Sequence, residues 1–137
     1  GTAWLDREWS SQPLASDQTG WDWFSLSFDD GHKLMGFRLR QADGSYYTSG
    51  TWITAQGGTT ALPDGSFDAT PLEITDVGSR QVPTRWQVRV PDYGVEVTVG
   101  AINPQAWMDM SIPYWEGPVR VSGSHGGIGY LEMTGYE

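Results

Sequence analysis

Turn signals that combine Gly with Asp, Pro or Ser recur at short intervals, and this spacing limits the available folds more than any other feature. These residues favour tight turns because they preset or tolerate the backbone angles that turns require. The segments between the signals are short and rich in Val, Ile, Thr, Trp, Tyr and Phe. This combination is typical of antiparallel strands joined by hairpins. The signals lie at residues 29–31, 42–45, 57–58, 63–65, 91–94 and 123–129.

The segments between the turns predict about nine strands and almost no helix. We expect the strands at Ala3–Trp9, Trp21–Phe28, Lys33–Arg40, Tyr46–Ile53, Asp68–Ile74, Arg85–Val90, Val95–Ala101, Trp115–Ser122 and Gly129–Thr134. Pro71 weakens the fifth prediction, because proline cannot donate to a strand ladder. Only Pro104–Met110 could hold a single helical turn. The predicted fold class is therefore all-β.

Alternation of apolar and polar residues gives most of these strands one packed face and one polar face. Met35, Phe37 and Leu39 share one face of their strand, and Arg38 and Arg40 share the other. Eight or more such strands hide their edges best by closing into a barrel. A barrel of about eight strands has an interior wide enough for one small ligand. A two-sheet sandwich is the alternative that periodicity leaves open.

Composition excludes several classes of function. The 137 residues fit one domain, and the net charge of −9 argues against nucleic acid, because an acidic surface repels phosphate backbones. The sequence has no Cys, which excludes disulfides, thiolate nucleophiles and cysteine-ligated zinc. No apolar run approaches the ~20 residues of a membrane helix. The chain opens without a basic, apolar signal segment, so we expect either a mature protein or a piece of a longer one.

The two histidines offer little chemistry. His32 and His125 both lie in glycine-bearing turns, where we expect solvated side chains. Two histidines cannot form a three-histidine metal site, and we predict neither a metal nor another cofactor. A Ser-His-Asp triad through His125 stays open, because triads are recognised by geometry.

Carboxylates set among aromatic residues are the better candidates for chemistry. Asp22 shares its strand face with an otherwise apolar row that includes Phe24 and Phe28. An acid in such surroundings can have its pKa raised and donate a proton near neutral pH. The alternative is that these acids pair with arginines across strands. The eight Trp residues pose a similar choice between core, the lining of an apolar cavity and an exposed platform for a sugar ring.

Several Trp-rich motifs resemble those of one family. They are Ala3–Trp9, Gly20–Phe24, Lys33–Arg40, Tyr114–Val119 and Gly129–Tyr136. The chain resembles the C-terminal lipocalin-like module of a family of predicted secreted hydrolases, and the resemblance runs from Gly1 almost to Glu137. This family is related to carotenoid hydratase (hydroxyneurosporene synthase) and kievitone hydratase.

The resemblance implies a single antiparallel lipocalin-like (calycin-type) barrel of about 8–10 strands over residues 1–137. It also implies a preceding lipocalin-like module in a tandem-barrel parent and a secreted or periplasmic location. Relatives hydrate isolated double bonds or guide cycloadditions in apolar pockets. We therefore expect an apolar or amphipathic small molecule as ligand, with acid–base chemistry if the protein is an enzyme. A non-catalytic carrier or structural partner domain is the alternative, and a carbohydrate-binding module is a weaker one.

The site residues follow from the same motifs. We predict Asp22, Glu8 and Glu116 as catalytic acids. The expected ligand-binding residues are Asp6, Trp21, Trp23, Arg38, Tyr114, Trp115, Tyr130 and Glu132.

Overall fold

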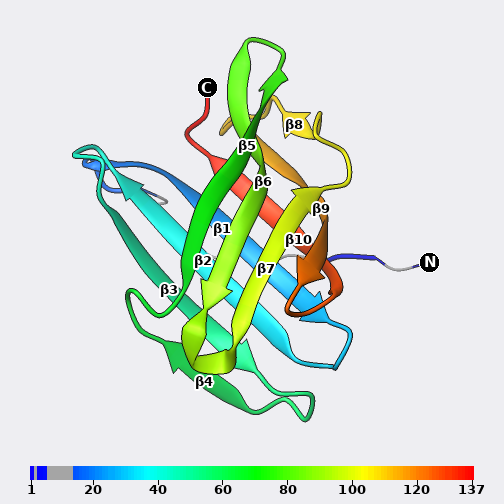
Figure 1. Cartoon of the computed structure of the whole chain (residues 1–137). Coiled ribbons are helices and arrows are strands. Elements are labelled where there is room, and N and C mark those ends of the chain that lie inside the picture. Colours follow the sequence, from blue (N-terminus) through cyan, green and yellow to red (C-terminus); the bar gives the residue numbers. More distant parts are fainter. Residues whose placement is uncertain (2, 6–13) are drawn as a thin grey trace.

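Strands dominate the computed structural model, which describes residues 1, 3–5 and 14–137 (Figure 1). The strands are β1 Gln18–Phe28, β2 Lys33–Gln41, β3 Tyr46–Ile53, β4 Thr59–Leu62, β5 Asp68–Val77, β6 Arg80–Val90, β7 Val95–Ala101, β8 Trp107–Met108, β9 Tyr114–Gly123 and β10 Gly127–Thr134. One short 3₁₀ helix, η1 (Pro91–Tyr93), links β6 to β7. The predicted all-β class with little helix is confirmed.

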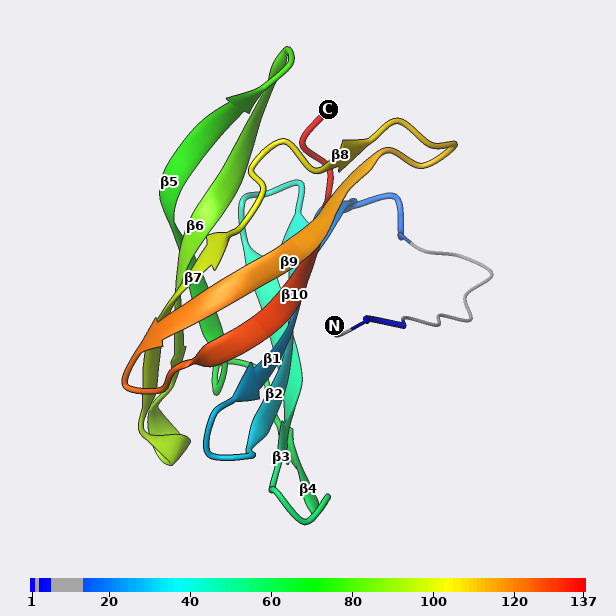
Figure 2. The ribbon, with the colours of Figure 1, turned by 90° about the vertical axis from the view of Figure 1, so that its right-hand side faces the viewer.

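All ten strands belong to one antiparallel sheet that curls on itself. Neighbours follow the order β4-β3-β2-β1-β10-β9-β7-β6-β5, and β8 pairs with β9 off this path. The curl lays β5, β6 and β7 over β1, β2 and β3, so that the two parts of the sheet face each other (Figures 1 and 2). Among the described residues the ladder ends at β4 and β5. Residues 63–67 connect these two edge strands. This connection places the Phe67 ring in the interior, with its centroid 5.8 Å from that of the Phe24 ring.

Eight of the nine predicted strands are present, with ends that differ by a few residues. In the ninth, Ala3–Trp9, residues 3–5 are not in a strand and residues 6–9 lie outside the described residues. The sequence pattern missed the short strands β4 and β8. Pro104–Met110, where the sequence allowed a single helical turn, contains β8. Strand β5 forms despite Pro71 because it lies at one end of the sheet and its register shifts beside that residue.

The interior between the two parts of the sheet is filled by large side chains. Trp86, Phe24 and Phe67 are fully buried, and the Phe24 ring meets the Trp86 ring edge-on at 5.4 Å. Gly36 lets the Phe67 ring approach the backbone of β2: a Cβ at this position would lie 2.3 Å from Phe67 Cε2. This part of the barrel therefore has a packed core where the sequence allowed a ligand-holding lumen.

Strand β2 buries the face opposite to the one that alternation predicts. Met35, Phe37 and Leu39 are only half-buried on the outer side, whereas Leu34 and Arg38 point inward and are buried. The expectation that the apolar row packs and the arginines meet water is wrong for this strand. The inward position of a guanidinium is possible because a carboxylate on β1 neutralises its charge, as described below.

Candidate functional site

The outer side of β1, β2, β10 and β9 carries a continuous group of aromatic and acidic side chains. One row across these strands pairs Phe37 with Trp23, Trp23 with Glu132, and Glu132 with Glu116. A parallel row pairs Met35 with Ser25 and Ser25 with Tyr130. Because residues directly opposite each other on antiparallel strands share a face, these side chains lie together on the outside of the barrel. We call the outward residues of this region the outer aromatic face: Trp21, Trp23, Met35, Phe37, Leu39, Tyr114, Glu116, Tyr130 and Glu132.

Two carboxylates stand side by side at the β9 end of the outer aromatic face. Glu116 and Glu132 are direct strand partners, and the Trp21 indole Nε1 donates to Glu132 Oε1 at 2.8 Å. The pKa of Tyr114 is raised, first by desolvation and then by the negative charges of Glu116 and Glu132. The arrangement combines flat apolar rings with a concentrated negative charge, which suits a molecule with an apolar body and a hydrogen-bond donor or cation.

Trp4, near the N-terminus, lies against this face. The Trp4 ring stacks on the Tyr130 ring with a centroid distance of 5.2 Å and an interplanar angle of 8°, and it meets the Trp23 ring edge-on at 6.0 Å. Figure 2 shows residues 3–5 beside β1 and β10, on the side away from β5 to β7. Trp4 nevertheless stays 41% exposed. The outer aromatic face can therefore hold a flat apolar group, as the stacked indole shows.

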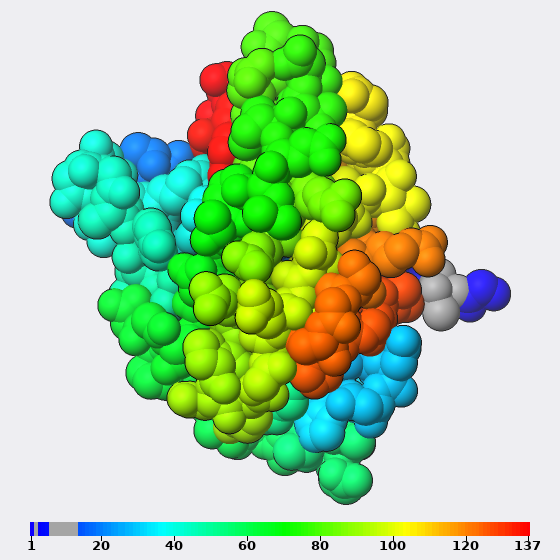
Figure 3. Space-filling model, viewed as in Figure 1, coloured from blue at the N-terminus to red at the C-terminus, as the bar shows by residue number. Residues whose placement is uncertain are grey.

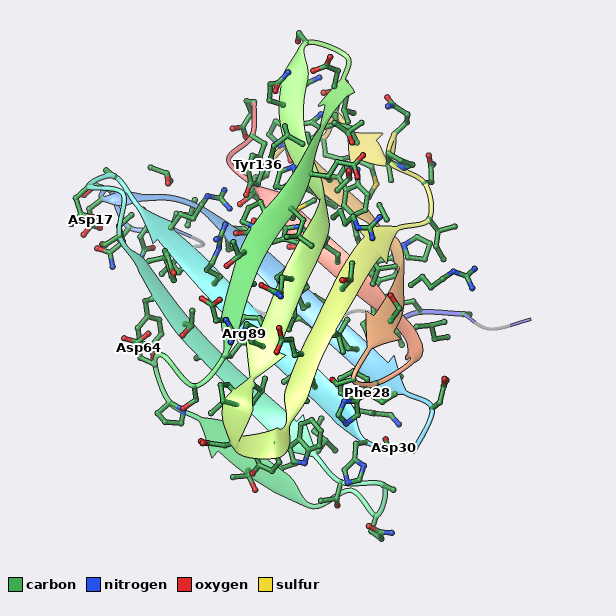
Figure 4. The ribbon with its side chains drawn as sticks, in the orientation of Figure 1. Asp17, Phe28, Asp30, Asp64, Arg89 and Tyr136 are labelled. Atoms are coloured by element: carbon green, nitrogen blue, oxygen red, sulfur yellow. The ribbon has the colours of Figure 1, made fainter. Side chains whose placement is uncertain are left out.

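A second cluster of charged residues lies inside the barrel, at the end that holds the C-terminal residues. Asp22 is fully buried, and its Oδ2 accepts from Arg38 Nε at 2.9 Å while its Oδ1 accepts from Arg40 Nη1. Tyr136 Oη donates to Asp22 Oδ1 at 2.9 Å. Arg38 also donates to the carbonyl of Ala69 at 2.9 Å, which ties β2 to β5. We call Asp22, Arg38, Arg40 and Tyr136 the Asp22 cluster; Figure 4 labels Tyr136 at the opposite end of the barrel from Phe28.

Aromatic rings complete the surroundings of the Asp22 cluster. The Arg38 guanidinium carbon lies 4.7 Å from the Trp86 ring centroid, and that of Arg40 lies 4.2 Å from the Tyr136 ring centroid. Desolvation, followed by the negative charge of Asp22, raises the pKa of Tyr136 well above its usual value. Tyr136 therefore stays a hydrogen-bond donor to Asp22 at neutral pH. None of the side-chain polar atoms of the cluster is both buried and without a partner, as buried charges require.

The structure divides the predicted site residues between these two places. Those on the outer aromatic face are Trp21, Trp23, Tyr114, Glu116, Tyr130 and Glu132. Asp22 and Arg38 lie in the Asp22 cluster, and Trp115 is buried in the core, where its Nε1 donates to the carbonyl of Pro104. Asp6 and Glu8 lie outside the described residues. The prediction omitted Arg40 and Tyr136, although each lies in one of the motifs on which it rested.

The two histidines lie at the other end of the barrel, beside the turn between β1 and β2. As expected, both belong to turns, but their rings are not simply solvated. The His32 ring stacks on Trp52 at 5.2 Å, and the His125 ring packs on Phe28 at 4.9 Å. Among the described residues no group of His, Asp and Glu is arranged to hold a metal ion. None of the helices in the described part is long and apolar enough to cross a membrane.

Comparison with known proteins agrees with this architecture. The family model described as AttH-like matches residues 1–136. The chain belongs to the AttH-like family. Its fold is similar to the crystal structure of a Nitrosomonas europaea protein that carries the provisional name AttH, with a TM-score of 0.82 and 28% identity over 94% of this chain.

The AttH-like chain spans 42% of the length of that structure. No curated protein matches it. The predicted lipocalin-like barrel is thus confirmed as the fold, and a fold of this type fits a ligand-binding domain.

Proposed function

We propose that this chain is a lipocalin-type binding module that holds an apolar or amphipathic small molecule on its outer aromatic face. The observation that carries the proposal is the division of side chains between the two sides of β1 and β2. Asp22 and Arg38 lie on the inner side, while Trp23 and Phe37 lie on the outer side as direct strand partners. An apolar row left at the surface is the arrangement expected of a binding face.

The packed core favours binding on the outer aromatic face and disfavours binding in the interior of the barrel. Trp86, Phe24 and Phe67 occupy the space between the two parts of the sheet and are fully buried. A ligand in that space would have to displace these rings, at a cost of several kcal/mol of lost burial. On the outer side the ligand would lie over Phe37 and Trp23 beside the Trp4 ring, without disturbing the core.

The paired carboxylates define the class of ligand more closely. Glu116 and Glu132 are hydrogen-bond acceptors when ionised, so the ligand should place hydroxyl groups or a cationic group over them. The apolar part of the same ligand would extend over Trp23 and Phe37. An amphipathic alcohol or amine with a flat or chain-like apolar body meets both requirements.

A preceding module of the same parent protein is the proposed cover of this face. Two observations support the proposal: the AttH structure of Nitrosomonas europaea is more than twice as long as the part that this chain matches, and Trp4 stacks on the outer aromatic face. We further propose, on the Trp-rich motifs alone, that the parent is related to the carotenoid and kievitone hydratases and is secreted or periplasmic.

Quenching of tryptophan fluorescence tests the binding proposal. Titration with a carotenoid-like probe such as retinol, and separately with palmitate, should give saturable quenching. The double variant Trp23→Ser/Phe37→Ser should weaken binding at least about tenfold, because it removes two large apolar surfaces. The matched control is Ile74→Ser, which removes an apolar side chain that is 50% exposed on β5. Equal affinity for the double variant and the unaltered chain would refute the proposal.

Acid–base catalysis is the second candidate function, and the geometry at Glu116 favours it. Two carboxylates held side by side can share a proton and transfer it, as hydration of a double bond requires. If such chemistry occurs on this face, Glu116→Gln should abolish turnover of retinol even at retinol concentrations that saturate the variant. A carrier without chemistry would show quenching and no product.

A further inference from the structure

A shallow groove farther along the outside of the barrel has a different character from the outer aromatic face. It lies on the outward side of β6, β7 and β9, which turns toward the viewer in Figure 3. Its volume is about 380 Å³, and its lining residues are Arg85, Thr98, Gly100, Ala101, Ile102, Arg120 and Ser122. No carboxylate lines it, although the sequence carries a net charge of −9.

Strand register explains how the groove arises. Arg85 on β6 pairs with Gly100 on β7, and Gly100 pairs with Arg120 on β9. The two arginines therefore flank a residue without a side chain, and two strand spacings put their backbones about 10 Å apart. A Cβ built on Gly100 would have no atom within 4 Å, so the space above it is open. In the neighbouring row Thr98 pairs with Ser122, which places two hydroxyl groups at one end of the groove.

The two guanidinium groups are free to bind a ligand. The arginines of the described chain that have an ion pair are Arg38, Arg40 and Arg80; Arg85 and Arg120 form neither an ion pair nor a side-chain hydrogen bond. Arg85 has one acidic strand partner, Glu73 on β5. The strand register shifts on both sides of Glu73. The partner of Arg120 on β10 is Ile128, which carries no charge.

We propose that this groove binds the oxyanion group, a carboxylate or a phosphate, of a small molecule. Arg85 and Arg120 would approach the anion from its two sides, each through the N–H fork that matches such oxygens in pairs. Thr98 and Ser122 would donate from their hydroxyl groups. Ile102 would contact whatever apolar part the molecule has. The site is independent of the outer aromatic face, so the failure of one proposal leaves the other standing.

The test is an NMR titration of the whole chain, with amide shifts followed at constant ionic strength while phosphate, acetate or octanoate replaces chloride. We expect saturable shifts at Thr98, Gly100 and Ser122 with at least one of the three anions. Saturation by phosphate alone assigns the phosphate group as the ligand class. Tighter binding of octanoate than of acetate assigns a carboxylate with an apolar tail.

Three variants and a control separate this site from general attraction of anions. Arg85→Gln and Arg120→Gln should each weaken binding by about 10- to 100-fold, as expected when a charge-assisted hydrogen bond is lost. Gly100→Leu should abolish binding by filling the groove, and the open space at Gly100 allows the chain to fold with this change. The control is Arg89→Gln, which removes an exposed arginine of the same strand outside the groove (labelled in Figure 4).

The outcome that overturns the proposal is equally specific. Shifts that do not saturate, or that weaken equally in Arg89→Gln and Arg85→Gln, would show that the anions only screen surface charge. If Gly100→Leu fails to fold, the two arginine variants still decide the question, because both side chains are exposed and neither contributes to the core.

Discussion

Replacing Asp22 by Asn should destabilise the protein strongly, because it leaves two arginines without their counter-charge inside the barrel. Asp22 has no exposed side-chain surface, and the side chains of its partners Arg38 and Arg40 are only 9% and 17% exposed. Removing one partner from a buried ion pair typically costs about 3–5 kcal/mol. The isosteric amide keeps the shape of the side chain, so nearly all of this loss would be electrostatic.

This cost converts into a large shift in thermal stability. A loss of 1 kcal/mol lowers the melting temperature by roughly 3 °C in a domain of this size, so Asp22→Asn should melt about 10–15 °C below the unaltered chain. Differential scanning calorimetry and circular dichroism measure the shift. Because the cluster is shielded from solvent, 0.5 M salt should change the difference little.

The chain offers a matched control for this experiment. Asp109 accepts from Arg80 at 2.9 Å, the same distance as between Asp22 and Arg38, but the Asp109 side chain is 74% exposed. Exposed pairs contribute roughly 0–1 kcal/mol, so Asp109→Asn should shift the melting temperature by less than about 3 °C. If the two variants melted at the same temperature, burial would not govern the strength of these pairs. The structural account of the Asp22 cluster would then be refuted.

Three further predictions concern the core and the cluster. Gly36→Ala should destabilise the fold by about 1–3 kcal/mol in urea unfolding, because its Cβ would overlap the Phe67 ring; unchanged stability would show that β2 is not packed as described. Trp86→Ala should cost about 3–5 kcal/mol and leave a cavity, and a loss below 1 kcal/mol would contradict a packed interior. The raised pKa of Tyr136 stabilises the fold below pH 10, the usual value of a tyrosine, and this contribution is lost as the pH rises above it. Between pH 10 and 12 the free energy of unfolding should therefore fall more steeply for the unaltered chain than for Tyr136→Phe, and equal slopes would contradict the assignment.

The sequence predicts the strands well because turn chemistry is local. Gly31, Gly44 and Gly65 occupy turns with positive φ, a conformation that glycine adopts without strain. In the sequence each follows an aspartate, a pair that is typical of turns. The short strands β4 and β8 escaped prediction because they have four and two residues, too few for a period to be visible. Their existence depends on their pairing with β3 and β9.

The buried face of β2 could not be predicted in the same way, because it depends on a partner distant in sequence. Alternation correctly groups Met35 with Phe37 and Arg38 with Arg40, but it cannot tell which group faces the core. That choice is made by Asp22, sixteen residues before Arg38 in the sequence, which holds both arginines on the inner side. A hydrophobic pattern assigns burial correctly only where no buried charge requires a partner.

The reversed faces of β2 also connect the stability of the fold to its proposed binding function. If Arg38 and Arg40 point inward, the period of two along the strand forces Met35, Phe37 and Leu39 outward. The outer aromatic face is therefore a geometric consequence of the Asp22 cluster. Substituting Asp22, Arg38 and Arg40 together by apolar residues of similar volume removes the buried charges without leaving one unpaired, which is often neutral for stability. Such a variant would keep the strand register and therefore the affinity for retinol. Asp22→Asn alone would reduce retinol binding only in proportion to the fraction of unfolded chain.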